Sequence, residues 1–142
     1  MLNELLALIY PECMVINKTN VHNKSATYLD MDINIVGNKA VTKVFDKRKE
    51  FNFKVRSLTH FNSNISMNTK LGVVMGQLIR FMTINSDFDL FIDECRCLFE
   101  KLLYLDYPRI LLKKSLKGFL NRYSLSSMVK YWKPIAVNMI IS

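Results

Sequence analysis

An alternation of apolar and polar residues runs from Tyr28 to Phe45, on both sides of the dipeptide Gly37-Asn38. This pattern is typical of β-strands with one buried face, and Gly-Asn is a dipeptide that closes a two-residue hairpin turn. Such a turn places these residues opposite one another: Ile35 and Ala40, Ile33 and Thr42, Met31 and Val44, Asp32 and Lys43. We therefore predict a β-hairpin with one mainly apolar face that packs on the rest of the protein.

The spacing of apolar residues changes after residue 66 to steps of three and four, which is the period of an amphipathic helix. Three helical stripes follow: Leu71, Val74, Met75, Leu78 and Met82; then Phe88, Phe91, Ile92, Cys95, Phe99 and Leu102; then Leu112, Leu116, Phe119, Leu120 and Tyr123. Ser86 with Asp89 has the form of a capping box for the second helix. Asp106 and Pro108 suit the N-cap and the first turn of the third.

Both ends of the chain carry further apolar segments. Leu2–Ile9 has helical spacing up to Pro11, whereas Asn17–Ser25 is polar and indicates a loop. A short fourth helix is expected over Ser126–Trp132. No stretch approaches the roughly 20 apolar residues that a membrane span needs, so we expect no transmembrane segment.

These elements divide the chain into an N-terminal helix and β-hairpin segment (1–66), a small bundle of three to four helices (67–133) and an apolar tail (134–142). Strands followed by helices, segregated along the sequence, indicate the α+β class. The three cysteines have no disulfide-framework spacing, and the first residues lack the features of a signal peptide. An intracellular protein is expected.

The chain has 20 Lys and Arg against 12 Asp and Glu, and its net charge of +8 favours polyanionic partners. Between Tyr104 and Ser142, seven cations accompany the single anion Asp106. The candidate nucleic-acid contacts are Lys47, Arg48, Arg80, Arg109, Lys113, Lys114, Lys117 and Arg122. A solvated helix face and an anionic membrane surface are the alternatives.

Phe51 and Phe53 follow the cations of Lys47–Lys49 and have strand-like alternation up to Val55. Aromatic rings beside cations can stack on the bases of nucleic acid. The alternative is that both rings belong to the hydrophobic core and follow a charged turn.

Two groups of residues suggest a metal site. Asp30 and Asp32 stand two apart on a predicted strand, so their carboxylates would share a face, as the ligands of a metal pair do. The alternative is that both are solvated or paired, with Lys43 placed to neutralise Asp32.

Cys95 and Cys97, together with His22 and His60, make the second group. Residues two apart on a helix point in nearly opposite directions, so the two thiols cannot share one zinc ion. We expect a packed Cys95 and a half-exposed Cys97 instead. The chain has no catalytic triad and no glycine-rich phosphate loop, and no cofactor is expected.

Several stretches, read in order, resemble the C-terminal part of reverse transcriptases of mobile elements, of the Penelope-like kind and their relatives. They are Tyr10-Pro11, Tyr28-Leu29-Asp30, Val44-Phe45-Asp46-Lys47-Arg48, Phe51-Asn52-Phe53, Ser63-Asn64-Ile65, Gln77-Leu78-Ile79-Arg80-Phe81, Lys101-Leu102-Leu103, Phe119 and Arg122-Tyr123. The resemblance implies the end of the palm followed by a helical thumb that holds a nucleic-acid duplex. It also implies a separate palm and fingers polypeptide as partner, with magnesium bound only in the complete polymerase.

The catalytic Tyr-x-Asp-Asp box of those enzymes has no counterpart here, since the chain contains no Asp-Asp pair. We therefore expect a protein that is not an enzyme by itself and that binds nucleic-acid duplex through a basic helical face. The alternative is a protein-interaction module that self-associates or docks a partner through exposed apolar residues. Its candidates are Leu2, Leu5, Trp132 and Ile135.

Overall fold

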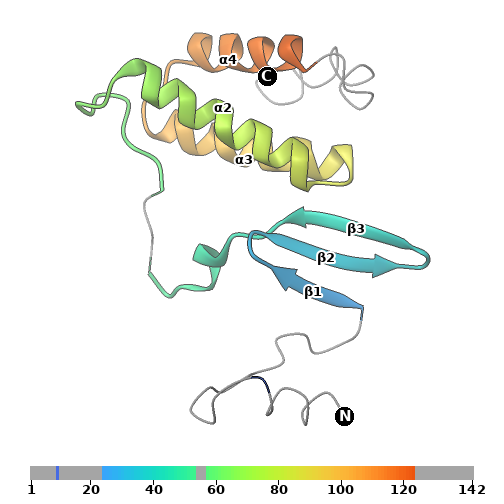
Figure 1. Ribbon diagram of the computed structural model, residues 1–142. Coiled ribbons are helices and arrows are strands. Elements are labelled where there is room, and N and C mark those ends of the chain that lie inside the picture. The colour runs from blue at the N-terminus through green and yellow to red at the C-terminus, as the bar shows by residue number, and fades with distance from the viewer. Residues whose placement is uncertain (1–8, 10–23, 54–56, 124–142) are drawn as a thin grey trace.

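The computed structural model describes residue 9 and residues 24–53 and 57–123. Within these residues a three-stranded sheet is followed by three α-helices, which confirms the predicted α+β class (Figure 1). The order differs from the prediction because a strand, and not the N-terminal helix, opens the main described part. Of the expected first helix only Ile9 is described, and it is helical.

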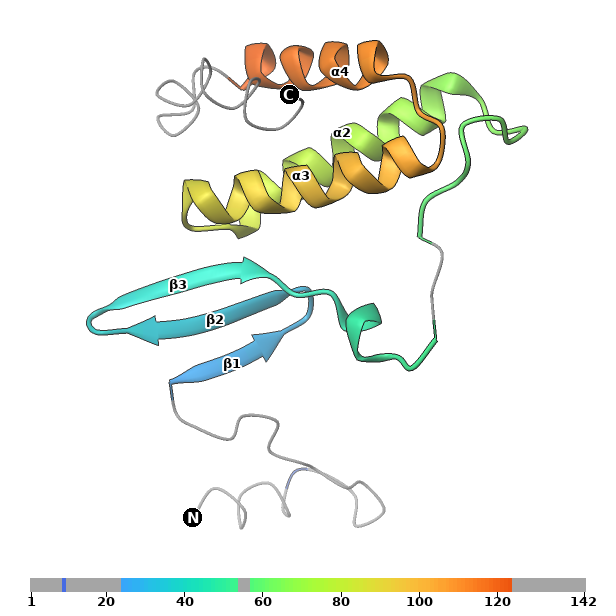
Figure 2. The ribbon, with the colours of Figure 1, turned by 180° about the vertical axis from the view of Figure 1, so that it is seen from behind.

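The strands are β1 (Ser25–Tyr28), β2 (Met31–Val36) and β3 (Lys39–Val44), and the 3-10 helix η1 (Lys47–Glu50) follows them. The α-helices are α2 (Met67–Ile84), α3 (Phe88–Tyr104) and α4 (Arg109–Arg122). Figures 1 and 2 show α2 and α3 between the sheet on one side and α4 on the other. Over residues 24–53 and 57–123, none of the helices combines the length and apolarity needed to cross a membrane.

The hairpin formed by β2 and β3 has the predicted register. Its antiparallel pairs include Met31 with Val44, Asp32 with Lys43, Ile33 with Thr42 and Ile35 with Ala40. Gly37 has a φ of 60° in the turn, which glycine adopts without the strain that a Cβ would cause. The alternation of the sequence was therefore sufficient to fix this pairing.

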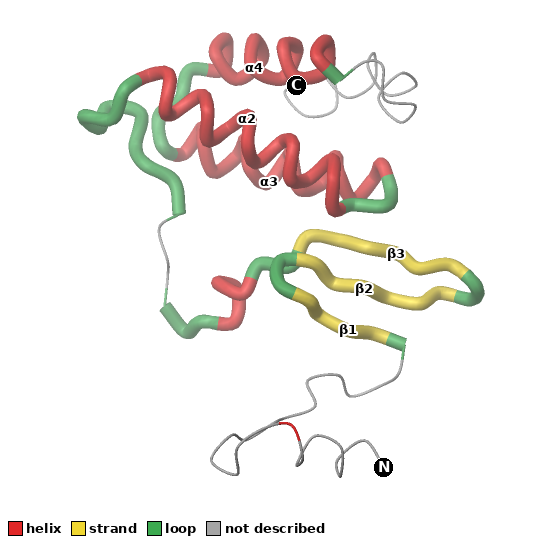
Figure 3. The backbone as a smooth tube through the Cα atoms, viewed as in Figure 1, coloured by secondary structure: helices red, strands yellow, loops and turns green. Residues whose placement is uncertain are grey.

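Strand β1 was not predicted, because Asn17–Ser25 indicated a loop and the alternation continued through residues 29 and 30. The chain instead turns at Leu29 and Asp30, so that Tyr28 pairs with Met31. Leu29 has a φ of 54°, an uncommon conformation for a residue with a branched side chain. Contacts distant in sequence hold this turn, since the Phe45 amide donates to the Asp30 carbonyl at 2.8 Å. Figure 3 shows the three strands as adjacent yellow segments.

The core lies among the helices and follows the predicted stripes. Its fully buried side chains include Val74 and Leu78 of α2, Cys95, Phe99 and Leu102 of α3, and Leu112, Leu116, Phe119 and Leu120 of α4. Phe81 is also buried, although it stands outside the predicted stripe. Burial of each large apolar side chain contributes about 1.5–3 kcal/mol. From the sheet, only Val44 joins the described core.

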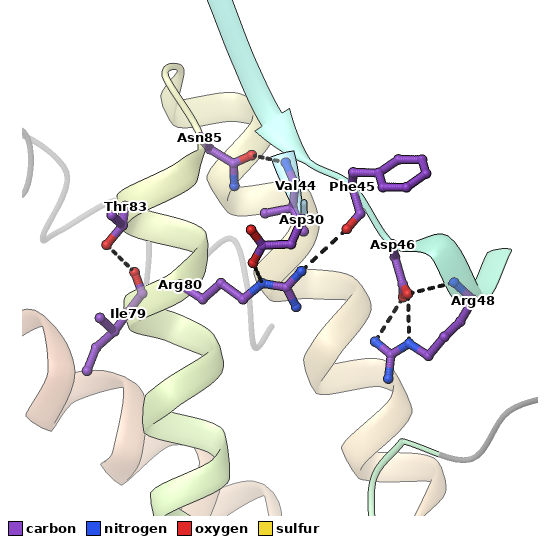
Figure 4. A network of polar contacts seen from close by, with 9 residues as sticks. All are labelled: Asp30, Val44, Phe45, Asp46, Arg48, Ile79, Arg80, Thr83 and Asn85. Carbon is purple, nitrogen blue, oxygen red and sulfur yellow. Dashed lines mark hydrogen bonds and ion pairs between the residues drawn. The ribbon is translucent and has the colours of Figure 1, made fainter. Parts of the chain in front are cut away.

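Polar contacts join the sheet to the end of α2. Asn85 is buried, and its Oδ1 accepts a hydrogen bond from the Val44 amide at 3.1 Å (Figure 4). Thr42 donates its hydroxyl to the Ile84 carbonyl at 2.6 Å and its amide to Ser86 Oγ at 3.1 Å. The predicted capping role of Ser86 is therefore wrong: the N-cap of α3 is Asp87, and Ser86 binds strand β3.

Some predicted elements fall in part or entirely outside the described residues. The fourth helix (126–132), the apolar tail (134–142) and the exposed apolar candidates Leu2, Leu5, Trp132 and Ile135 lie there. The strand expected over Phe51–Val55 is not formed by residues 51–53, which bend and stack the two phenylalanine rings at 5.3 Å.

Candidate nucleic-acid interface

A tight turn joins α3 to α4 over residues 105–108. The Tyr107 amide donates to the Leu102 carbonyl at 3.0 Å, and the Asp106 amide donates to the Leu103 carbonyl at 3.1 Å. Asp106 has a φ of 62°, so the turn has the pattern of hydrogen bonds and the left-handed residue of a Schellman motif. The N-cap role predicted for Asp106 is wrong: Asp106 is the left-handed residue after the C-cap of α3, and Pro108 is the N-cap of α4.

Side chains from the loop before α2 fix this turn in place. Tyr107 is buried and meets the Phe61 ring edge-on, with 5.3 Å between the ring centroids. The Phe61 amide donates to the Leu105 carbonyl at 2.9 Å, and His60 Nε2 lies 3.2 Å from Asp106 Oδ2. The angle at which α4 leaves α3 is thus determined by packing as well as by the turn itself.

The same loop is fixed to α2 by a buried lysine. Lys70 Nζ donates to the carbonyl oxygens of Phe61 and Ser63 at 2.6 and 2.8 Å, and it lies 5.6 Å from the centre of the Phe61 ring. Ser66 begins α2 as its N-cap, since its hydroxyl accepts from the Thr69 amide at 3.2 Å. Through these contacts the loop before α2 is fixed both to α2 and to the turn between α3 and α4.

The outward side of α4 is strongly basic. We call five exposed residues the α4 basic face: Arg109, Lys113, Lys114, Lys117 and Arg122. The helix contains no Asp or Glu, and none of these five forms an ion pair with another residue in the described part of the chain. Five uncompensated cations on one exposed helix create a positive potential that attracts polyanions.

The dipole of α4 adds to this potential at one end. No acidic residue stands in the first turn, and no side chain caps the N-terminus. The positive end of the helix therefore lies beside Arg109, with no acidic residue within the first turn. On its opposite side the helix is anchored by Leu112, Leu116 and Phe119, all fully buried, so that its outward side is held rigidly.

The other three candidate cations lie away from α4. In Figures 1 and 2 the pair α2 and α3 separates α4 from η1, which carries Lys47 and Arg48. Lys47 is exposed, whereas Arg48 binds Asp46 through two hydrogen bonds, of 2.7 and 3.0 Å. Hydrogen bonds from the Arg48 side chain lower the pKa of the Asp46 carboxyl.

Arg80 is occupied by contacts within the protein. Its Nε donates to Asp30 Oδ2 at 2.8 Å, and its Nη2 donates to the Phe45 carbonyl at 3.4 Å (Figure 4). Both partners lie at the ends of strands, so Arg80 joins α2 to the sheet. The structure thus brings five predicted residues together on α4 and places the remaining three at or near the junction between sheet and helices.

The geometry of Asp30 and Asp32 does not support a metal pair. Asp30 lies in the turn before β2 and Asp32 within it, so the two do not share one strand, and they bind Arg80 and Lys43 respectively. The predicted pairing of Asp32 with Lys43 is confirmed at 3.7 Å, and Thr27 also donates to Asp32 at 2.6 Å.

Cys95 is fully buried, as predicted, and Cys97, which was expected to be half-exposed, is exposed. Burial raises the pKa of the Cys95 thiol. Within residues 24–53 and 57–123, no three His, Cys, Asp or Glu side chains gather in a way that could hold a metal ion.

Residues 57–117 match the model of a protein family, the animal helix-turn-helix domain. The match covers fewer than half of the 142 residues, and it includes α2, α3, the turn after α3 and most of α4. No curated protein and no solved structure matches the chain. Since helix-turn-helix motifs bind DNA, the match indicates nucleic-acid binding.

This match overturns the resemblance to a reverse transcriptase. The runs Gln77–Phe81 and Lys101–Leu103, which the resemblance assigned to a thumb, lie inside the region that matches the animal helix-turn-helix model. Each run is short and consists mostly of the apolar and basic residues that many amphipathic helices carry, so their order is not specific to a reverse transcriptase. The polymerase partner and the magnesium implied by the resemblance lose their basis with it.

Proposed function

We propose that this protein is a DNA-binding protein and not an enzyme, and that it inserts α4 into the major groove of duplex DNA. The observation that supports this best is the α4 basic face, which follows a tight turn inside the matched helix-turn-helix region. In such motifs the second helix lies in the major groove while the first crosses the backbone. In this protein those helices would be α4 and α3.

The dimensions of α4 suit this placement. The major groove is about 12 Å wide and admits one α-helix. The 14 residues of α4 extend for about 21 Å, enough to follow the groove across several base pairs. Long Lys and Arg side chains on the exposed side can then reach the phosphates on both walls of the groove.

Duplex binding is tested by replacing three residues of the α4 basic face together, Lys113→Ala, Lys114→Ala and Lys117→Ala. The affinity is measured by fluorescence anisotropy on a labelled duplex of about 20 base pairs, two helical turns, over a series of salt concentrations. We expect weaker binding and a slope of log affinity against log salt that becomes shallower by about 0.9 for each phosphate that the variant no longer neutralises.

A matched control removes the same charge from elsewhere, with Lys24→Ala, Lys39→Ala and Lys47→Ala. These three lysines are exposed and lie on the sheet side of the molecule. If net charge alone determined binding, both triple variants would bind more weakly by the same factor. Equal weakening, or an unchanged salt slope in the α4 variant, would contradict the proposal that α4 is the binding element.

A further inference from the structure

One large apolar side chain of α4 points away from the core. Ile110, the second residue of the helix, is 83% exposed, whereas Leu112, Leu116 and Phe119 are fully buried. Ile110 was not among the candidates predicted from the sequence, because it lies outside the apolar stripe and carries no charge. Its isolation from the stripe is itself the signal that could have identified it.

The neighbours of Ile110 further along the helix surface are all cations. Residues three, four and seven positions further along a helix lie on the same side, and here they are Lys113, Lys114 and Lys117. Single exposed apolar residues are common on protein surfaces and usually need no explanation. An isoleucine beside three lysines, however, limits the kind of surface that can cover it.

Such a partner must offer an apolar group close to several anions. An apolar patch of another protein would remove water from the lysines without supplying partners, which is unfavourable. The major groove of DNA meets both requirements, since the C5-methyl group of thymine projects into it between two lines of phosphates. The N-terminal residues of a recognition helix are also those that contact base edges.

We propose that Ile110 contacts the C5-methyl group of thymine, so that the protein prefers duplexes with thymine where the N-terminal turn of α4 meets the groove. This inference rests on the proposed function. Isoleucine has no polar side-chain atom, so it distinguishes bases through the methyl group alone. The surrounding lysines hold the helix to the phosphates and supply affinity independent of sequence.

The test compares an A·T-rich duplex with the same duplex in which uracil replaces every thymine, because uracil lacks only the methyl group. We expect the unaltered protein to bind the thymine duplex more tightly, by roughly fourfold for each methyl group that Ile110 covers. Ile110→Ala, which keeps only the Cβ of the side chain, should lose most of this difference. Comparing the thymine-to-uracil ratio of affinities between the unaltered protein and Ile110→Ala cancels effects of uracil on DNA shape that do not depend on Ile110.

Leu29→Ala is the matched control, because Leu29 is an aliphatic residue of equal size, 79% exposed, at the turn between β1 and β2. It should keep the thymine preference of the unaltered protein. Salt-dependent binding with no difference between thymine and uracil would overturn this inference and leave the proposed function intact. An absence of any duplex binding would contradict the proposed function itself.

A membrane partner would give a different result. Vesicles that contain phosphatidylserine offer anions and an apolar layer together. If the unaltered protein bound such vesicles in a manner that Ile110→Ala abolished, and showed no thymine preference, Ile110 would be a membrane contact and the inference would be wrong.

Discussion

At the scale of single residues, charge alone does not show what a side chain does. Eight cations were selected from the sequence, and two of them, Arg48 and Arg80, form hydrogen bonds to carboxylates within the protein. The partner of Arg80 is Asp30, fifty positions away in the chain. A pairing across that separation depends on the tertiary fold and leaves no trace in local sequence patterns. For the five cations of α4, exposure without a carboxylate partner in the described part of the chain could be expected, because their helix contains no acidic residue.

Arg80→Gln tests whether Arg80 joins the sheet to α2 or contacts DNA. We expect the thermal midpoint to fall by an amount equivalent to about 1 kcal/mol, because the ion pair with Asp30 is partly exposed. The salt slope of DNA binding should remain that of the unaltered protein. Thermal unfolding followed by circular dichroism measures the first effect, and anisotropy over a series of salt concentrations measures the second. A shallower slope at unchanged stability would show that Arg80 is a DNA contact.

At the scale of elements, structure that depends on a periodic pattern of apolar residues was predicted correctly. Single turns and single side-chain contacts, which have no such pattern, were missed. The β2–β3 register and the buried stripes of α3 and α4 depend on periodic apolar residues, and both were predicted correctly. The turn at Leu29 has neither glycine nor asparagine in its left-handed position, so no local signal marks it. The role of Ser86 was missed for a similar reason, since its partner Thr42 lies on a distant strand.

Helix α4 should need its buried side for stability and its exposed side for binding. Leu116 is fully buried, so Leu116→Ala should lower the free energy of unfolding by about 2–5 kcal/mol, as for other large-to-small core substitutions. Lys113→Ala, which replaces an exposed side chain, should change it by less than about 0.5 kcal/mol. Urea titrations of both variants give these values. An unchanged stability of the Leu116→Ala protein would show that α4 does not pack on the bundle.

At the scale of the whole molecule, the sheet and the helices contribute unequally to the core. Val44 is the single strand residue in the described core, and the rest of that core lies between Val74 and Leu120. Strand β1 is exposed along its full length. The helical part therefore contains almost all of the described core and should fold by itself, whereas the sheet needs the surface of α2 to pack against.

This asymmetry predicts how the protein can be divided. A chain of residues 57–123 contains the buried lysine, the α3–α4 turn and the whole α4 basic face, so it should remain helical and bind duplex DNA. Its stability should be lower, because a domain of about 70 residues buries a smaller fraction of its surface than a longer one. The fragment also lacks the hydrogen bonds from Thr42 and Val44. A chain of residues 24–53 should be unfolded, since a small sheet is stable in water only when its apolar face is covered. Circular dichroism and DNA binding of both fragments test this division. A helical fragment that no longer binds DNA, while the complete chain does, would mean that the sheet or residues outside 57–123 form part of the interface.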